Sequence, residues 1–207
     1  MSHHPTATEH AVCAHSTRPL LRAAFGLALL TLVAFGFFYS LASTWITAAL
    51  FPRQAMGSML YSHGQIVGSA LVAQPFTAPG YFHSRPSACD YDPMKASGSN
   101  QARSNPDLRV RLLKTRHEVA LRDHVAEESV ASDLITQSAS GLDPDISFAA
   151  AKEQEARVAK ARGLTRERVH QLVLATMPAK TVDTDQSYVN VLTLNLALDR
   201  VVAELQK

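Results

Sequence analysis

The chain has 207 residues and a formal net charge of +2, with 20 Lys and Arg against 18 Asp and Glu. This near balance excludes the basic stripe that a nucleic-acid-binding protein needs, so we expect no nucleic-acid partner. A long apolar segment near the N-terminus leaves about 155 residues beyond it, which is enough for one domain with its own core.

The apolar segment runs from Ala23 to Leu50 and contains no charged side chain. As an α-helix it would be about 42 Å long, enough to cross a hydrocarbon core of about 30 Å with tilt or a projecting end. A buried helix of a soluble protein is usually shorter and has one polar face. A cleaved signal peptide is the second alternative, because Ser40-Leu41-Ala42 resembles a cleavage site, but its apolar core would run only about 7–15 residues. We therefore predict a retained transmembrane helix at residues 20–51.

The charges that flank this helix predict its orientation. Arg18 and Arg22 precede it closely, whereas only Arg53 follows it within thirty residues. Cytoplasmic flanks favour Lys and Arg, so residues 1–19 are expected to form a disordered cytoplasmic tail and residues 52–207 a periplasmic domain of a bacterial inner-membrane protein. Cys13 and Cys89 then fall on opposite sides of the membrane and cannot pair. The residues expected to anchor the chain in the lipid bilayer include Ala23, Phe37, Tyr39, Trp45 and Leu50.

The first part of the outer domain mixes short elements with a long loop. Residues 65–72 are partly β-branched and bounded by glycine, which predicts a strand. Residues 74–105 are rich in Gly, Pro, Ser and Asn, and loops of that length are often functional. Pro106 is suited to the first turn of a helix that we expect to run to Glu128. Its predicted buried stripe consists of Val110, Leu113, His117, Leu121 and Val125.

The C-terminal part predicts two capped helices, a strand and a last helix. Residues 130–136 form either a strand or a turn of helix. Ser147 is a good N-cap for a helix over 148–162, and Gly163 suits its C-terminal end. Thr165 begins the next helix, which Met177 and Pro178 end. A strand at 189–192 and an amphipathic final helix complete a mixed α+β domain carried on one N-terminal transmembrane helix.

The sequence carries little that resembles catalytic chemistry. It contains no phosphate-binding loop, no G-x-S-x-G, no H-E-x-x-H and no C-x-x-C. Asp143 and Asp145 stand beside Pro144 and are expected to form a helix-entry loop. Gln154 lies on the apolar side of its helix, where we expect neighbouring backbone to satisfy the buried amide. We therefore predict that this chain is not itself an enzyme and holds no metal or covalently bound cofactor.

An ordered set of short motifs resembles one known family. The set comprises 68-GSALVAQPF-76, 80-GYFHSRPSA-88, 91-YDP-93, 97-SGSN-100, 104-SNP-106, 138-SASGLD-143, 157-RVAKARG-163, 189-VNVL-192 and 194-LNLALD-199. In this order behind one membrane helix, they resemble the C subunit of the Kdp potassium-transporting P-type ATPase, the KdpC family. The departures are Gln101-Ala102-Arg103, Phe148, Glu155-Ala156 and Thr193, which differ from the residues usual in the family at those places.

The resemblance implies an accessory subunit needed for assembly of a larger complex. Its partners would be a channel-like potassium-binding subunit, an ATP-hydrolysing P-type subunit and a small single-helix subunit. The family is described as a catalytic chaperone that raises the ATP affinity of the pump, and a glutamine is implicated in nucleotide contact. Gln154 occupies a plausible matching position.

Topology conflicts with direct nucleotide contact, because a domain outside the membrane meets little ATP. We therefore expect an indirect effect on ATP affinity through differential contacts with the partners. The residues expected to contact partners are Tyr81, Phe82, His83, Arg85 and Asn100. The alternative for their loop is internal packing, with Arg85 bound to backbone carbonyls. For the whole chain, the alternative function is a membrane-anchored periplasmic binding module without enzymatic activity.

Overall fold

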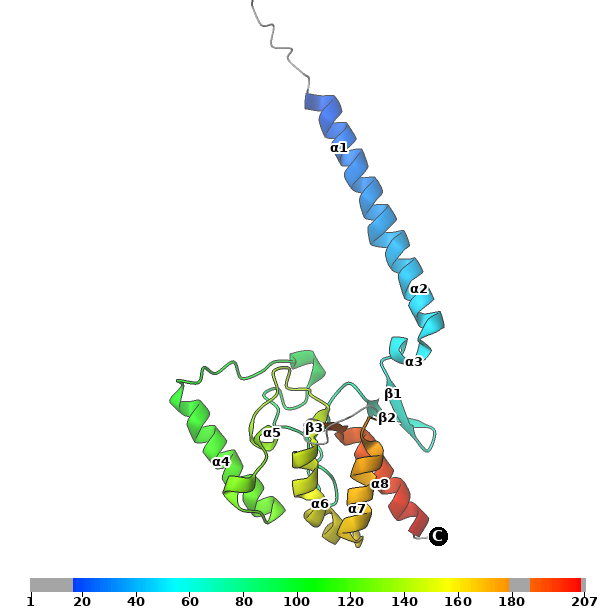
Figure 1. Ribbon diagram of the computed structural model, residues 1–207. Coiled ribbons are helices and arrows are strands. Elements are labelled where there is room, and N and C mark those ends of the chain that lie inside the picture. The colour runs from blue at the N-terminus through cyan, green and yellow to red at the C-terminus, as the bar shows by residue number, and fades with distance from the viewer. Residues whose placement is uncertain (1–16, 179–186, 206–207) are drawn as a thin grey trace, which may run out of the picture. The chain divides into compact units, whose positions relative to one another are not determined.

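The computed structural model describes residues 17–178 and 187–205 (Figure 1). The chain divides into two compact units, Met1–Ala55 and Met56–Lys207, and each is described here by itself. The predicted tail at 1–19 lies mostly outside the described residues, and residues 17–19 already belong to the first helix.

The first unit is one long apolar helix. It comprises α1 (Thr17–Thr31), a π-helical stretch η1 (Leu32–Tyr39) and α2 (Ser40–Leu50). Residues Arg18–Leu50 are long and apolar enough to span a membrane, which confirms the predicted helix as a candidate span. Side-chain hydroxyls such as that of Thr47 donate to carbonyls one turn earlier, so these polar groups are satisfied within the helix, as hydrocarbon surroundings require.

A proline ends this helix and begins the next one. Phe51 leaves the helical conformation with φ −132°, and Pro52 opens the single turn α3 (Pro52–Ala55). Proline cannot donate the next helical hydrogen bond but is well suited to a first turn.

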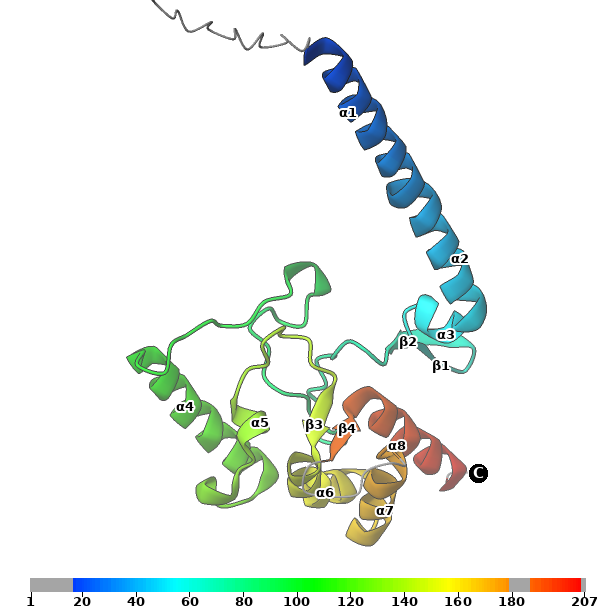
Figure 2. The ribbon, with the colours of Figure 1, turned by 45° about the horizontal axis from the view of Figure 1, so that its top comes forward.

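The second unit confirms the α+β class, with short antiparallel strands among helices. Its sheets are β1–β2 and β3–β4, each of two strands (Figure 2). The elements in chain order are β1 (Met59–Ser62), β2 (Gln65–Ser69), η2 (Pro93–Lys95), α4 (Pro106–Asp123), η3 (Glu127–Ser129), α5 (Ser132–Ile135), β3 (Asp145–Ser147), α6 (Phe148–Arg162), α7 (Arg166–Thr176), β4 (Tyr188–Asn190) and α8 (Val191–Leu205).

The strand expected at 65–72 is shorter than predicted and forms β2, the second strand of a hairpin. His63 and Gly64 both have positive φ, 49° and 78°, and form the tight turn that joins β1 to β2. The strand ends at Ser69, whose hydroxyl oxygen accepts from the Leu71 amide. This side-chain bond competes with further strand pairing.

Helix α6 is central in the domain and forms as the sequence predicts. The Ser147 hydroxyl accepts from the Ala150 amide at 3.1 Å, and Gly163 adopts the left-handed φ of 65° at the other end. Helix α6 packs against α7, α4 and α5. The buried residues of the helix include four small or branched apolar ones, but also Gln154, Glu155 and Arg157.

The predicted stripe on α4 is wrong. The helix ends at Asp123, because His124 turns into the left-handed region with φ 57°. Val110, Leu113 and Leu121 are 65%, 55% and 62% exposed, and His117 is exposed as well. The helix instead buries Val119, Ala120 and Asp123. Helical spacing marks an apolar face but does not say which face packs, and α4 has apolar residues on more than one side.

Asp145, expected in a helix-entry loop, instead begins strand β3 because it pairs with Asn190 of β4, while the other elements follow the expectations closely. Residues 132–135 form the turn of helix α5, Thr165 caps α7, and Met177 ends that helix. Strand β4 is shifted to 188–190, because Val191 already begins α8.

Leu194 on α8 is fully buried in the main core, so replacing it tests the packing. We expect Leu194→Ala to lower the free energy of unfolding by about 2–5 kcal/mol, because it leaves a cavity. Leu205 on the same helix is 70% exposed, so Leu205→Ala should change it by at most about 0.5 kcal/mol. Urea unfolding followed by circular dichroism measures both. An equal loss of unfolding free energy in the two variants would contradict the burial of Leu194 and the exposure of Leu205.

Candidate functional site

Residues 79–83, here the 79–83 segment, begin in a turn, which the Tyr81 amide closes by donating to the Ala78 carbonyl at 3.1 Å, and side chains bind all five of the segment's carbonyls. Asn195 on α8 accepts from the Phe82 amide at 2.8 Å and donates to the Phe82 carbonyl at 3.0 Å. Gln154 on α6 accepts from the His83 amide at 2.8 Å and donates to the His83 carbonyl at 3.2 Å. Two buried amides thus bind successive residues of the segment as neighbouring strands would, which satisfies backbone groups that water cannot reach.

Gln154 has no free hydrogen-bonding capacity. Its side chain is 0% exposed, it donates to the Ala150 carbonyl at 3.2 Å, and it accepts from the Arg157 guanidinium at 2.7 Å. The expectation of a buried amide satisfied by neighbouring backbone is confirmed. Gln154 fixes the 79–83 segment to α6.

Two arginines bind the remaining carbonyls of the segment. Arg157 donates to the carbonyls of Pro79 and Tyr81, and Arg162 donates to that of Gly80 at 2.7 Å. The Arg162 guanidinium lies 4.3 Å from the centre of the Tyr81 ring, a cation–π distance. These bonds need the fork geometry of arginine, which presents several donors at fixed angles.

Asp123 at the end of α4 balances the buried charge of Arg157. Its carboxylate is completely buried and binds Arg157 on one oxygen and the neighbouring Arg122. Burial by itself would raise the pKa of Asp123, but the hydrogen bonds and charges of Arg122 and Arg157 outweigh it and lower the pKa. The carboxylate therefore stays ionised and joins α4 to α6.

His83 is the titratable group of the segment. Its Nε2 lies 3.2 Å from the Ala78 carbonyl. Burial, followed by the positive charges of Arg122 and Arg157, lowers its pKa from 6.5 to about 4. The ring is therefore neutral at physiological pH.

The residues expected to contact partners are not gathered on one surface. Phe82 is 0% exposed and belongs to the core, while Tyr81 and His83 are half-buried. Arg85 pairs with the Asp143 carboxylate at 2.9 Å rather than with backbone carbonyls. Asn100 is exposed, with a positive φ of 51°. Contact of these residues with a partner stays a prediction, and Phe82 would have to leave the core to make one.

A cavity of about 770 Å³ lies beside the segment. Its lining includes the cationic side chains of Arg122, Arg157, Lys160 and Arg166. Gln154 does not line this cavity. The lining residues are Thr77, Pro79, His83, Arg122, Asp123, His124, Val125, Glu153, Ala156, Arg157, Lys160, Ala161 and Arg166. Within residues 17–178 and 187–205, no three His, Cys, Asp or Glu side chains are grouped to hold a metal ion.

Sequence reasoning missed Asp123, Arg157 and Asn195 as parts of this site. Arg157 follows Gln154 by about one helical turn, so a buried Gln154 indicates that Arg157 lies near the same face. Asn195 stands between the buried Leu194 and Leu198, and an amide in that position is the signal that could have revealed it.

These features define an α+β domain, behind one candidate membrane span, whose buried polar residues hold a loop in place. The family model of KdpC, "K+-transporting ATPase, c chain", matches residues 21–200. The chain belongs to this family.

Curated relatives agree with that assignment. The chain is 55% identical over 181 residues to the potassium-transporting ATPase KdpC subunit of Xanthomonas oryzae pv. oryzae, covering 87% of each chain. It is 45% identical over 202 residues to that of Shewanella putrefaciens, covering 97% of this chain and 96% of the relative. The chain is 41% identical over 184 residues to the KdpC subunit of Acidobacterium capsulatum, covering 87% of this chain and 98% of the relative.

Replacing Gln154 tests whether its amide supports the fold. We expect Gln154→Leu to lower the free energy of unfolding by about 2–5 kcal/mol, because it leaves the His83 backbone and Arg157 with unpaired buried groups. Gln171 on α7 is exposed, so Gln171→Leu is the matched control and should change little. Urea unfolding measures both, and wild-type stability of Gln154→Leu would contradict the role assigned to the amide.

The lowered pKa of His83 predicts a pH-dependent stability. The unfolded histidine takes up a proton near pH 6.5, whereas the folded one does so only near pH 4, so the free energy of unfolding should fall as pH falls through this window. Burial raises the pKa values of Asp145 and Glu153, and these groups act in the opposite direction.

A difference measurement isolates the histidine. Wild type and His83→Gln are unfolded with urea from pH 7.5 to pH 4, since a Gln amide can still donate to the Ala78 carbonyl. The variant should gain stability relative to wild type as pH falls. A constant difference across this range would contradict the lowered pKa.

Proposed function

We propose that this chain is an accessory subunit of an ATP-driven potassium-uptake complex. The observation that carries the proposal is the family match over residues 21–200 behind a single apolar helix. Relatives in three bacterial genera are named as KdpC subunits of a potassium-transporting ATPase. The partners are a channel-like potassium-binding subunit, an ATP-hydrolysing P-type subunit that performs the catalysis, and a small single-helix subunit.

In this proposal the long helix anchors the chain in the bacterial inner membrane, with the N-terminus in the cytoplasm and the α+β domain in the periplasm. Arg18 and Arg22 support this orientation, since positive residues favour the cytoplasmic side and only Arg53 follows the helix closely. Trp45 and Tyr39 are 74% and 67% exposed on the helix, free to meet lipid or a neighbouring helix.

The domain acts on the ATP affinity of the pump indirectly, through the conformation of the complex. Gln154, the residue associated with nucleotide by family resemblance, is fully buried and uses its amide on His83, Ala150 and Arg157. A nucleotide could reach it only by breaking those bonds. Its effect on ATP would come from the fixed position of the 79–83 segment, which alters contacts with the partners and so shifts the equilibrium between pump states.

A periplasmic binding module is the second candidate, and the cavity beside the 79–83 segment favours it. Lys160 lines this cavity together with apolar groups, whereas the arginines that line it, Arg122, Arg157 and Arg166, already bind Asp123 or Glu155. An anionic small molecule would suit such a lining. This candidate requires that the chain bind its ligand alone, without other subunits.

Two variants distinguish the indirect effect from nucleotide contact. Gln154→Leu and Asn195→Leu each remove one of the two amides that bind the segment. In the complete complex, both should raise the KM for ATP in the same direction, by about threefold to tenfold, a typical size for coupling between sites. Potassium-stimulated ATP hydrolysis by the purified complex gives this value, with Gln171→Leu as control.

Direct contact gives a different outcome, because only the Gln154 variant would then change the KM. Recovery of the tagged wild-type chain from detergent without any other subunit would contradict the accessory role itself. Protection of a protease site fused after Lys207 against protease added outside spheroplasts would contradict the periplasmic orientation.

A further inference from the structure

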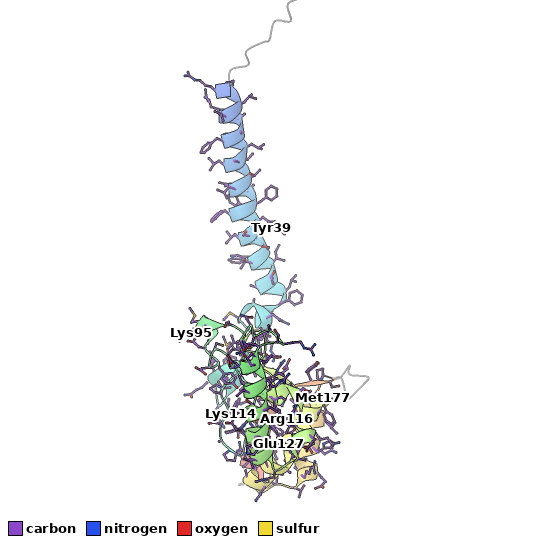
Figure 3. The ribbon with its side chains drawn as sticks, turned by 90° about the vertical axis from the view of Figure 1, so that its left-hand side faces the viewer. Tyr39, Lys95, Lys114, Arg116, Glu127 and Met177 are labelled. Carbon is purple, nitrogen blue, oxygen red and sulfur yellow. The ribbon has the colours of Figure 1, made fainter. Side chains whose placement is uncertain are left out.

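Helix α4 exposes the apolar stripe that its sequence predicts to be buried. Val110, Leu113 and Leu121 are more than half exposed, while the packed face of the helix holds Val119 and Ala120. Every buried residue of α4 lies in its last five positions, and from the first two-thirds of the helix only the partly buried Leu112 packs against the core. The helix lies at the edge of the domain and faces the viewer in Figure 3, where Lys114 and Arg116 are labelled.

A shallow groove of about 330 Å³ adjoins this stripe. It contains leucines and arginines only, with no acidic residue, and its lining residues are Arg103, Leu108, Arg109, Leu112, Leu113 and Arg116. None of its three arginines makes a hydrogen bond or ion pair with any residue that the structure describes, and the Nε of Arg116 is buried without an acceptor. In contrast, the nearby Arg111 donates to Gln101 at 3.0 Å.

The three unpaired arginines of the groove contribute little to the stability of the isolated domain. Arg109 lies near the N-terminus of α4, where the helix dipole disfavours positive charge. Arg103 and Arg116 add like charge without a carboxylate to offset it. Arginine forks bind carboxylates with two parallel hydrogen bonds, and leucines beside them provide the apolar part of a protein interface.

We propose that the groove and the stripe, together the α4 face, dock a partner-subunit segment that carries carboxylates beside apolar side chains. The inference rests on the proposed function, because it requires a complex. The stripe from Val110 to Leu121 is about 16 Å long on a helix, which suits a short helix or strand of a partner.

Charge reversal in the complete complex tests the proposal. Arg103 and Arg109 are both exposed, so Arg103→Glu/Arg109→Glu should leave the fold unchanged, as thermal unfolding by circular dichroism would show. Recovery of partner subunits with the tagged chain should fall about tenfold or more at moderate salt. Arg200→Glu, on an exposed arginine of α8, is the matched control and should keep wild-type recovery.

A photo-crosslinking residue at position 113 identifies the occupant. In the complete complex it should attach to one peptide of a partner subunit that contains Asp or Glu, and the crosslink should be lost in Arg103→Glu/Arg109→Glu. Crosslinks to phospholipid alone, or wild-type recovery of partners with the double variant, would overturn the α4 face as a protein-docking surface. If the wild-type chain brings no partner subunits, the proposed function fails instead, and the two failures are thereby distinguished.

Discussion

The domain depends on satisfying the backbone of one irregular segment that has no strand beside it. Residues 79–83 are bound by side chains of α6 and α8, and two amides and two arginines accept from or donate to most of their backbone groups. A sheet would provide such bonds from backbone, whereas this domain provides them from side chains far apart in sequence. Loss of any one of these side-chain hydrogen bonds leaves a buried polar group unpaired. The bonds therefore fix the segment, α6 and α8 relative to one another.

Burying Arg157 for this purpose requires a buried negative charge. Asp123 meets that requirement from the end of α4, and its own desolvation is offset by Arg122 as well as Arg157. The ion pair therefore ties a peripheral helix to the central one. Since an unpaired buried charge costs several kcal/mol, α4 cannot shift relative to α6 without breaking this contact, and this makes the position of α4 well defined for docking.

A rigid domain of this kind suits the accessory role that we propose. It holds its loop and its helices in one arrangement, and any effect on a pump would come from how well that arrangement fits different states of the complex. The residue associated with nucleotide by resemblance belongs to the rigid framework. The indirect effect that we propose therefore requires no contact between this residue and a nucleotide.

The sequence by itself determined the long apolar helix that is a candidate membrane span, the family, the α+β class and the bounds of α6 and α7, because apolar length, ordered motifs and caps such as Ser147 and Thr165 are local signals. It also indicated a buried, satisfied Gln154. Only the tertiary structure decided what Gln154 binds, that Arg157 and Asp123 are buried together, and that the stripe of α4 faces outward. These outcomes depend on which surfaces meet across distant parts of the chain, and helical spacing contains no information about that.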